Sequence, residues 1–402
     1  MKRGMALLCA AALIILPGCW SRREPKNLAI IPSLLFDVND DETFTLTIEF
    51  MDPVPPTGGK ETSESVDIIV MSNGNTIPEA LRNAEQTVER HLYTAHIEVR
   101  FLSEKFASSG QAMSCLSDVI SRDHIASMRP TMVVVRGDEP EKIYECVTEY
   151  SDNLGSYLQD MVKTQPLATS KSVFVTHLNF TRDFYTEGKE PVLGCIEIVE
   201  DPAPSSMLSA SKSGGGENEQ KKMKIILEGL AAFKQGVLAG FMNGNEARAY
   251  NILTNQFSGS YLSSAADRHG TVVDITGAKS KIKTDVSGER PVIDVSVDVT
   301  MSLSQIGHGI DINDPAMITA IEQNISDQLT LEINGAVQKA QQEFGSDIFG
   351  FGAEIHRQHP HAWRQMKDGW ADLFPTADVR LRVESCLERL GKLEDPFIRE
   401  RS

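Results

Sequence analysis

The chain has 402 residues, 41% of them hydrophobic, and a formal net charge of −17 at neutral pH. This length is enough for two or three domains with hydrophobic cores of their own, so the fold does not need disulfides or metals for its stability. The acidic excess argues against nucleic acid as a partner and predicts repulsion from anionic lipid surfaces.

The N-terminus has the pattern of a bacterial lipoprotein signal. Two basic residues precede an apolar run that closes with Leu16-Pro17-Gly18-Cys19. The run from Met5 to Leu16 is shorter than the roughly 20 residues that a membrane-spanning helix needs, which favours cleavage over spanning. We therefore predict that residues 1–18 are a signal peptide and that Cys19 is lipidated. The alternative is an ordinary secretion signal in which the cysteine occurs by chance.

The residues after the predicted cleavage site are suited to the membrane surface. A diacylglyceryl group on Cys19 would bury two acyl chains at about 0.8 kcal/mol per CH₂, which is enough for stable anchoring. Trp20 has an amphipathic ring typical of the interface, and Arg22 and Arg23 suit anionic headgroups. We predict that the covalent lipid anchors the mature protein outside the cytoplasm, with these three residues close to the bilayer.

The first half of the chain mixes strands and helices in irregular order, which predicts an α+β fold. We predict strands over residues 28–35, 43–51, 66–71, 96–102, 131–136 and 191–199, and helices over 111–121, 140–147 and 156–163. The clearest helix begins after Thr76, which forms a capping box with Glu79 and has Pro78 in the first turn. Apolar residues at helical spacing predict that this helix reaches Leu92.

A segment composed like a flexible linker separates this half from the next. Asp201 to Lys222 combines prolines and three consecutive glycines with no apolar periodicity. Beyond it, Lys234-Gln235-Gly236 predicts a hairpin between strands 225–233 and 237–242. A helix through Leu253 follows, then a long half-solvated strand over 293–304 and a helix over 314–344, about 45 Å in length. Two shorter helices, with a break near His359-Pro360, and a strand over 379–383 complete the pattern.

The cysteines outside the signal show no regular framework. Four remain after Cys9 and Cys19, and no two of them have CxxC spacing: Cys115, Cys146, Cys195 and Cys386. This spacing disfavours metal binding by thiolates and is typical of small buried hydrophobic residues. Their disulfide state stays open.

Segments along the whole chain carry a resemblance to one family. They are the mature start Gly18 to Glu24, the helix region Thr76 to His96, the hairpin entry Glu228 to Phe233, and Ser346 to Gly352 with the helix through Trp363. In this order they resemble the Ger(x)C lipoproteins, the C subunits of spore nutrient germinant receptors.

The resemblance implies a three-domain α+β lipoprotein on the extracytoplasmic face of the inner spore membrane. Such a protein is expected to assemble with two integral membrane subunits, one with a large soluble domain and one transporter-like, and to trigger germination. It implies no catalytic residue, cofactor or metal. The expected divisions are a signal peptide (1–18), an N-terminal domain (19–204), a linker (205–222), a middle sheet domain (223–310), and a C-terminal region (311–402) that shares a sheet with 270–305.

Two other classes of function compete with this interpretation. Glu354, His356, His359 and His361 suggest a metal site, but Pro360 disfavours one continuous helical face, and surface histidines at a helix end are the alternative. An independent extracytoplasmic solute-binding lipoprotein would share the same location, although its usual repeated βαβ alternation is not the pattern here. A hydrolase would need a nucleophile motif, and the sequence contains none that we recognise.

Overall fold

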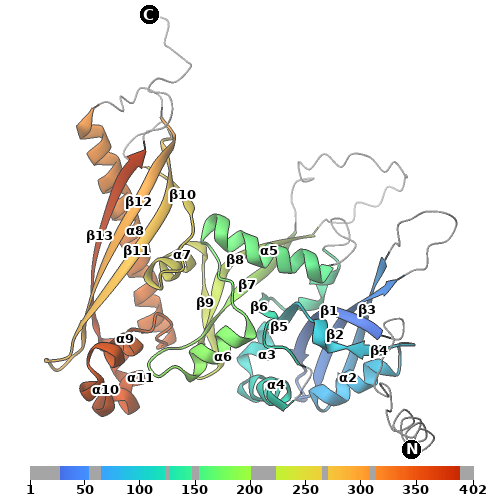
Figure 1. Ribbon diagram of the computed structural model, residues 1–402. Helices are drawn as coiled ribbons and strands as arrows, with labels where there is room; N and C mark the ends of the chain where they lie inside the picture. The colour runs from blue at the N-terminus through green and yellow to red at the C-terminus, as the bar shows by residue number, and fades with distance from the viewer. Residues whose placement is uncertain are drawn as a thin grey trace, which may run out of the picture.

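The protein folds into two β-sheets with helices packed against both, as a computed structural model shows for residues 28–53, 65–122, 126–146, 154–200, 223–264, 270–307 and 314–389 (Figure 1). Within these residues the first sheet has nine strands and the second has four. The strands of each sheet run in mixed directions, and helices alternate irregularly with strands along the chain. The predicted α+β class is therefore confirmed.

The first sheet has the order β3-β2-β1-β5-β6-β7-β8-β9, with β4 paired to β1 outside this path. The pairs from β1 to β7 through β5 and β6 are parallel, and those toward both edges are antiparallel. All five residues of the central β5 are buried, as expected for a parallel strand covered on both faces. The strands are β1 (Leu28–Val38), β2 (Phe44–Pro53), β3 (Ser65–Gly74), β4 (His91–Tyr93), β5 (Val99–Ser103), β6 (Thr131–Arg136), β7 (Val192–Glu200), β8 (Met223–Lys234) and β9 (Val237–Met242).

Helices cover both faces of the first sheet and create two cores. One core lies against α2 (Ile77–Glu85), α3 (Glu104–Ser108), α4 (Gly110–Arg122) and α6 (His177–Tyr185). The other lies against η3 (Pro140–Tyr144) and α5 (Leu154–Thr169). The helices predicted over 111–121 and 156–163 correspond to α4 and α5, whereas the 140–147 segment forms only a short 3₁₀ turn.

The helix after Thr76 is shorter than predicted. It ends at Glu85, and the chain then forms β4 and the 3₁₀ turn η2 (Thr94–His96). The helix ends early because the residues that follow form β4, which gains hydrogen bonds by pairing in parallel with the start of β1. Thr76 Oγ1 does accept the N–H of Glu79 (3.2 Å), but the Glu79 carboxylate accepts the N–H of Asn75 (2.9 Å) in place of Thr76. The predicted capping box is therefore shifted by one residue.

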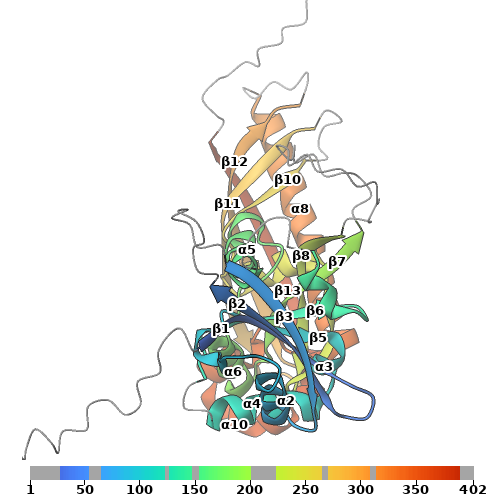
Figure 2. The same cartoon turned by 90° about the vertical axis from the view of Figure 1, so that its right-hand side faces the viewer.

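The second sheet has the order β10-β11-β12-β13 and packs one face against a long helix. Its strands are β10 (Ser260–Ser263), β11 (Val272–Asp285), β12 (Val292–Gln305) and β13 (Asp378–Arg389). The helix is α8 (Pro315–Lys339), extended by the π-helical turn η4 (Ala340–Phe344) and ended by Gly345 in the left-handed region. Figure 2 shows β11, β12 and α8 running past the end of the first sheet. The long helix and long strand predicted here are confirmed.

A cluster of short helices lies at one end of α8. It consists of α9 (Phe351–Gln358), α10 (Pro360–Met366), η5 (Lys367–Gly369), α11 (Trp370–Leu373) and η6 (Phe374–Thr376). The chain breaks between α9 and α10 at His359, as predicted from the proline that follows.

The hairpin β8–β9 joins the first sheet, although it follows the predicted linker. β8 pairs antiparallel with β7 from Val192↔Ala232 to Glu200↔Met223, and its two-residue turn places Gln235 and Gly236 at positive φ. The helix α7 (Gly244–Leu253) comes next and leads to the second sheet. The sequence assigned residues 223–242 to a middle sheet domain, but local patterns do not reveal which distant strand a hairpin will pair with. The domain boundaries stay a prediction, and residues 205–222 lie outside the described residues.

Candidate functional site

The residues predicted to contact the membrane lie outside the part of the chain that the structure describes. Cys19, Trp20, Arg22 and Arg23 all precede Leu28, where β1 begins. Their roles in lipidation and membrane contact therefore stay predictions. Among the helices of the described residues, none combines the length and apolar character needed to cross a bilayer.

The Ser346–Gly352 segment is built around one buried carboxylate. Asp347 is 3% exposed, and its Oδ1 accepts the backbone N–H groups of Gly350 (2.9 Å) and Phe351 (3.0 Å). Its Oδ2 accepts the N–H of Gly352 (2.7 Å) and Nε1–H of Trp370 (3.0 Å). Burial raises the pKa of Asp347 to about 6 in spite of these four donors. The carboxylate therefore caps the start of α9 and fixes α11 beside it.

The same segment contacts the first half of the protein through the backbone. The N–H of Glu190 donates to the backbone oxygen of Asp347 (2.9 Å), and the N–H of Ala353 donates to the oxygen of Gly188 (3.0 Å). Gly188 has φ +76, and a Cβ placed on it would lie 2.5 Å from the backbone carbon of Gly352. Only glycine fits at this point, because the loop after α6 and the start of α9 touch without side chains between them.

Polar side chains tie the same loop to α10 and the turn after it. The Glu187 carboxylate accepts Nε1–H of Trp363 (2.9 Å) and lies 3.4 Å from Nζ of Lys367. The hydrogen bond from Trp363, followed by that from Lys367, lowers the pKa of Glu187. The loop after α6 is therefore bound to the C-terminal helices on both its backbone and its side-chain surface.

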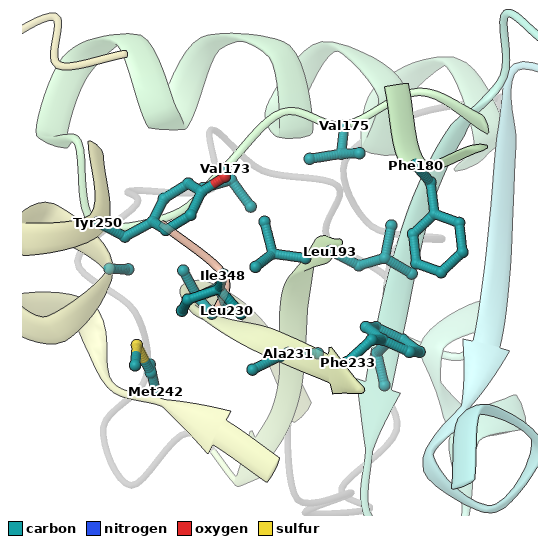
Figure 3. Close-up of a cluster of buried hydrophobic side chains, with 14 of the residues drawn as sticks. Val173, Val175, Phe180, Leu193, Leu230, Ala231, Phe233, Met242, Tyr250 and Ile348 are labelled. Atoms are coloured by element: carbon teal, nitrogen blue, oxygen red, sulfur yellow. The ribbon is translucent and has the colours of Figure 1, made fainter. Parts of the chain in front are cut away.

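Apolar side chains complete the joint between the Ser346–Gly352 segment and the first half of the protein. Ile348 lies among buried residues of the first sheet and α7, including Leu230 and Tyr250 (Figure 3). Phe349 and Phe351 are both buried, with ring centroids 5.4 Å apart, and Phe349 also packs against Tyr250 at 6.1 Å. Both phenylalanines are therefore core residues of this joint.

Two ion pairs connect α7 with α8 next to this joint. Arg248, only 2% exposed, makes a bidentate contact with Glu332 through Nη2 to Oε1 (2.6 Å) and Nε to Oε2 (3.0 Å). Lys339 Nζ lies 3.0 Å from the carboxylate of Glu246. The sequence did not reveal these pairs, because their partners are far apart in the chain. Asp347 was also missed, because it lies three residues before Gly350, the N-cap residue of α9, and so does not occupy the position at which capping residues are recognised.

The three histidines near the C-terminus do not converge. His359 Nε2 contacts the backbone oxygen of Thr284 at 2.7 Å, while His361 Nδ1 contacts Arg364 at 2.6 Å. The ring of His356 stacks on Trp363. In the described part of the chain, no three His, Cys, Asp or Glu side chains are grouped closely enough to hold a metal ion.

The cysteines of the described residues are free thiols. Cys146 and Cys195 are buried, which raises their pKa values to about 11 and about 12, so both are protonated at neutral pH. Cys115 is half-buried and Cys386 is exposed. Protonated, buried thiols are not nucleophiles. Cys146 and Cys195 therefore act as core residues, as predicted from their spacing.

One surface cleft, of about 320 Å³, lies between α4 and α6. Its wall includes Met113, Phe180 and Ser117, together with the buried His177, whose Nδ1 has no hydrogen-bond partner among the described residues. Burial, with a smaller effect of Arg100, lowers the pKa of His177 to about 4, so the ring is neutral at pH 7. Serine and threonine hydroxyls also line the cleft, but within the described residues none of them is hydrogen-bonded to Nδ1 of His177, as a base-activated nucleophile would be.

Family models match most of the chain. A model described as Spore germination protein N-terminal domain matches residues 21–198, and one described as Spore germination B3/GerAC like, C-terminal matches residues 228–391. Neither description names an enzyme. The second match contains most of β8, all of β9 and the Asp347 side of the joint, whereas Glu187, Gly188 and Glu190 lie in the first match.

Several spore germination proteins are similar to this chain over nearly their entire length. Spore germination protein KC of Bacillus subtilis (strain 168) is 26% identical over 98% of this chain and 97% of its own length. Spore germination protein B3 of the same organism is 21% identical over 94% and 96%, respectively. The crystal structure of the GerBC protein superposes with a TM-score of 0.53 at 17% identity, covering 88% of this chain and 96% of that one, and so shares the fold. The chain therefore belongs to the GerAC-like family of spore germination proteins, and its role lies in spore germination.

Proposed function

We propose that this protein is a lipid-anchored subunit of a spore nutrient germinant receptor. It acts by assembly with two integral membrane subunits, one with a large soluble domain and one transporter-like, on the extracytoplasmic face of the inner spore membrane. The observation that carries this proposal is the similarity to spore germination proteins KC, B3 and A3 over 94 to 98% of the chain. The lipoprotein pattern that ends at Cys19 supports the membrane attachment.

A non-catalytic role is supported by the polar side chains described above, which bind other parts of the chain. Asp347, Glu187 and Arg248 all bind other parts of the chain, where they join loops and helices to each other. These contacts make one continuous body out of both sheets, since the loop after α6 and the start of α9 are bonded through their backbones. A body of this kind can transmit contact between partners without performing a reaction.

The distance from the predicted anchor supports a position close to the membrane. Leu28, the first residue of β1, comes nine residues after Cys19. A fully extended chain spans at most about 3.6 Å per residue, so the start of the first sheet would lie within roughly 30 Å of the lipidated cysteine. That distance is within reach of the water-exposed parts of integral membrane subunits.

Affinity purification tests the proposal. Tagged protein is extracted with mild detergent from inner membranes of dormant spores, and the retained proteins are identified by mass spectrometry. We expect two transmembrane subunits with the wild type. Cys19→Ala should release the protein from the membrane fraction and impair germination, whereas Cys386→Ala, which changes an exposed cysteine, should do neither. Recovery of the lipoprotein alone would contradict the proposal and favour an independent solute-binding protein.

A further inference from the structure

Several strand edges in the described part of the chain are blocked by side chains. A free edge exposes unpaired N–H and C=O groups that can pair with another chain. β11 extends beyond the short β10, and there Asn255 bonds both backbone groups of Ser280 at 2.8 and 3.1 Å. Gln358 accepts the N–H of Thr284 and donates to the oxygen of Ile282, both at 2.9 Å. This edge is therefore closed to another strand.

Three other edges of the described strands, those of β13, β9 and β10, are also protected. Along β13, the N–H of Ser385 donates to Ser326 (3.1 Å) and the N–H of Leu387 donates to Glu322 (2.8 Å), both on α8. No residue of β9 is exposed. β10 has only four residues, and Gln328 of α8 donates to its last backbone oxygen (3.1 Å).

β3 is different, because it is long and open on one side. All ten of its residues pair with β2, and no other described strand pairs with it. On the outer side Asn83 donates to the backbone oxygen of Asn73 (2.8 Å). Alternate residues of an antiparallel strand direct their backbone groups to the same side, so Ile69 and Met71 also direct theirs outward. No hydrogen bond to another described residue reaches these outward groups.

The side chains along this edge are apolar and exposed. Ile69 is 41% exposed and Met71 is 59% exposed, whereas Ile68 and Val70 pack against the core. Residues 68–74 contain no charged residue and no proline, which are the usual means of preventing strand addition. The protected β11 edge, in contrast, also carries three exposed lysines at positions 279, 281 and 283.

We propose that β3 is the docking edge for an extended segment of an integral membrane subunit, which adds to the first sheet as a tenth strand. This inference rests on the proposed function. The unpaired backbone groups require a strand as the occupant, and its side chains facing Ile69 and Met71 are uncharged and apolar. β3 lies two strands, about 10 Å, from β1, so the edge stays near the predicted anchor at Cys19 and within reach of a membrane partner.

The first test places a charge on this edge. Met71→Lys is introduced into the tagged full-length protein, with Leu331→Lys as the matched control, because Leu331 is 74% exposed on α8, away from β3. Met71→Lys should lower the recovery of membrane subunits by about tenfold, since a lysine would face an apolar strand, while Leu331→Lys should leave it unchanged. Equal melting temperatures of the two variants and the wild type exclude a folding defect as the cause.

Hydrogen exchange distinguishes strand addition from side-chain contact. In the purified lipoprotein the amides of Ile69 and Met71 should exchange rapidly, and in the assembled receptor they should be protected. Normal recovery of partners with Met71→Lys, or a complex in which these amides stay unprotected, would overturn the inference and leave the proposed function intact. If the wild type recovers no membrane subunit, the proposed function fails and the docking edge fails with it.

Discussion

Replacing Asp347 with asparagine should remove a specific pH dependence from the stability of the protein. Burial raises the pKa of this carboxyl from 3.8 to about 6 in the folded state. The folded protein therefore binds a proton more tightly at this position than the unfolded chain does. The resulting stabilisation is fully present below about pH 4, the pKa of the carboxyl in the unfolded chain, and is lost as the pH rises through about 6.

The size of the effect follows from the shift in pKa. A difference of about two pKa units corresponds to roughly 3 kcal/mol. The free energy of unfolding of the wild type, minus that of Asp347→Asn, should fall by about this amount between pH 4 and pH 7 and then stay constant. Taking the difference removes the contributions of the other titrating groups, which both proteins share.

Urea denaturation at a series of pH values is the suitable assay. Trp370 donates to the carboxylate and Trp363 packs against Trp370 with ring centroids 5.6 Å apart, so tryptophan fluorescence reports unfolding of this region. Asp372→Asn, at an exposed position on α11, serves as the control and should show no such change. If the four N–H donors to Asp347 outweigh its burial, the difference will instead be flat above pH 4 or rise with pH, and the reasoning from burial is wrong.

Three further changes test the joint and the anchor. Phe351→Ala should reduce the free energy of unfolding by roughly 3 to 5 kcal/mol in the same assay, because the ring is fully buried among other aromatic rings. Arg248→Ala should cost about 3 to 5 kcal/mol in thermal or urea unfolding, since it leaves the carboxylate of Glu332 largely buried and unpaired. Cys19→Ala should move the protein from the membrane to the soluble fraction of spore lysates, as detected by immunoblot.

Each of these three predictions can be contradicted by a specific result. An unchanged unfolding curve for Phe351→Ala would mean that the ring is exposed in solution and available to a partner. The double variant Arg248→Ala with Glu332→Ala should recover part of the lost stability; if it does not, the pair is not the cause. Cys19→Ala that still sediments with membranes would show that another part of the chain provides the attachment.

Elements with local start and stop signals were predictable from the sequence. The hairpin β8–β9 and the helix α7 are marked by Gln235-Gly236 and by Asn243, whose side chain forms a capping box with Glu246. The long helix α8 is marked by Asp314-Pro315 at its start. In each case the signal and the structure that it produces are only a few residues apart.

Elements that depend on distant partners were not predictable. A sheet was expected over residues 270–305, but β11 itself was not predicted, because a bulge between Ile275 and Gly277 interrupts its alternation and its lysines resemble a loop composition. α2 was predicted too long because the pairing of β4 with β1 ends the helix. The joint around Asp347 was missed for the same reason, since it requires Trp370 and the loop at Gly188, which come from different parts of the chain.

The pairing of β7 with β8 has a consequence for exchange between related genes. The two family models meet in the interval between residues 198 and 228, where a recombination point would be expected to keep both halves intact. The ladder from Val192↔Ala232 to Glu200↔Met223 crosses that interval. A chimera of two relatives joined there would have to match the strand of one parent to the hairpin of the other. Sequence divergence at these few positions therefore limits which halves can be combined into a folded subunit.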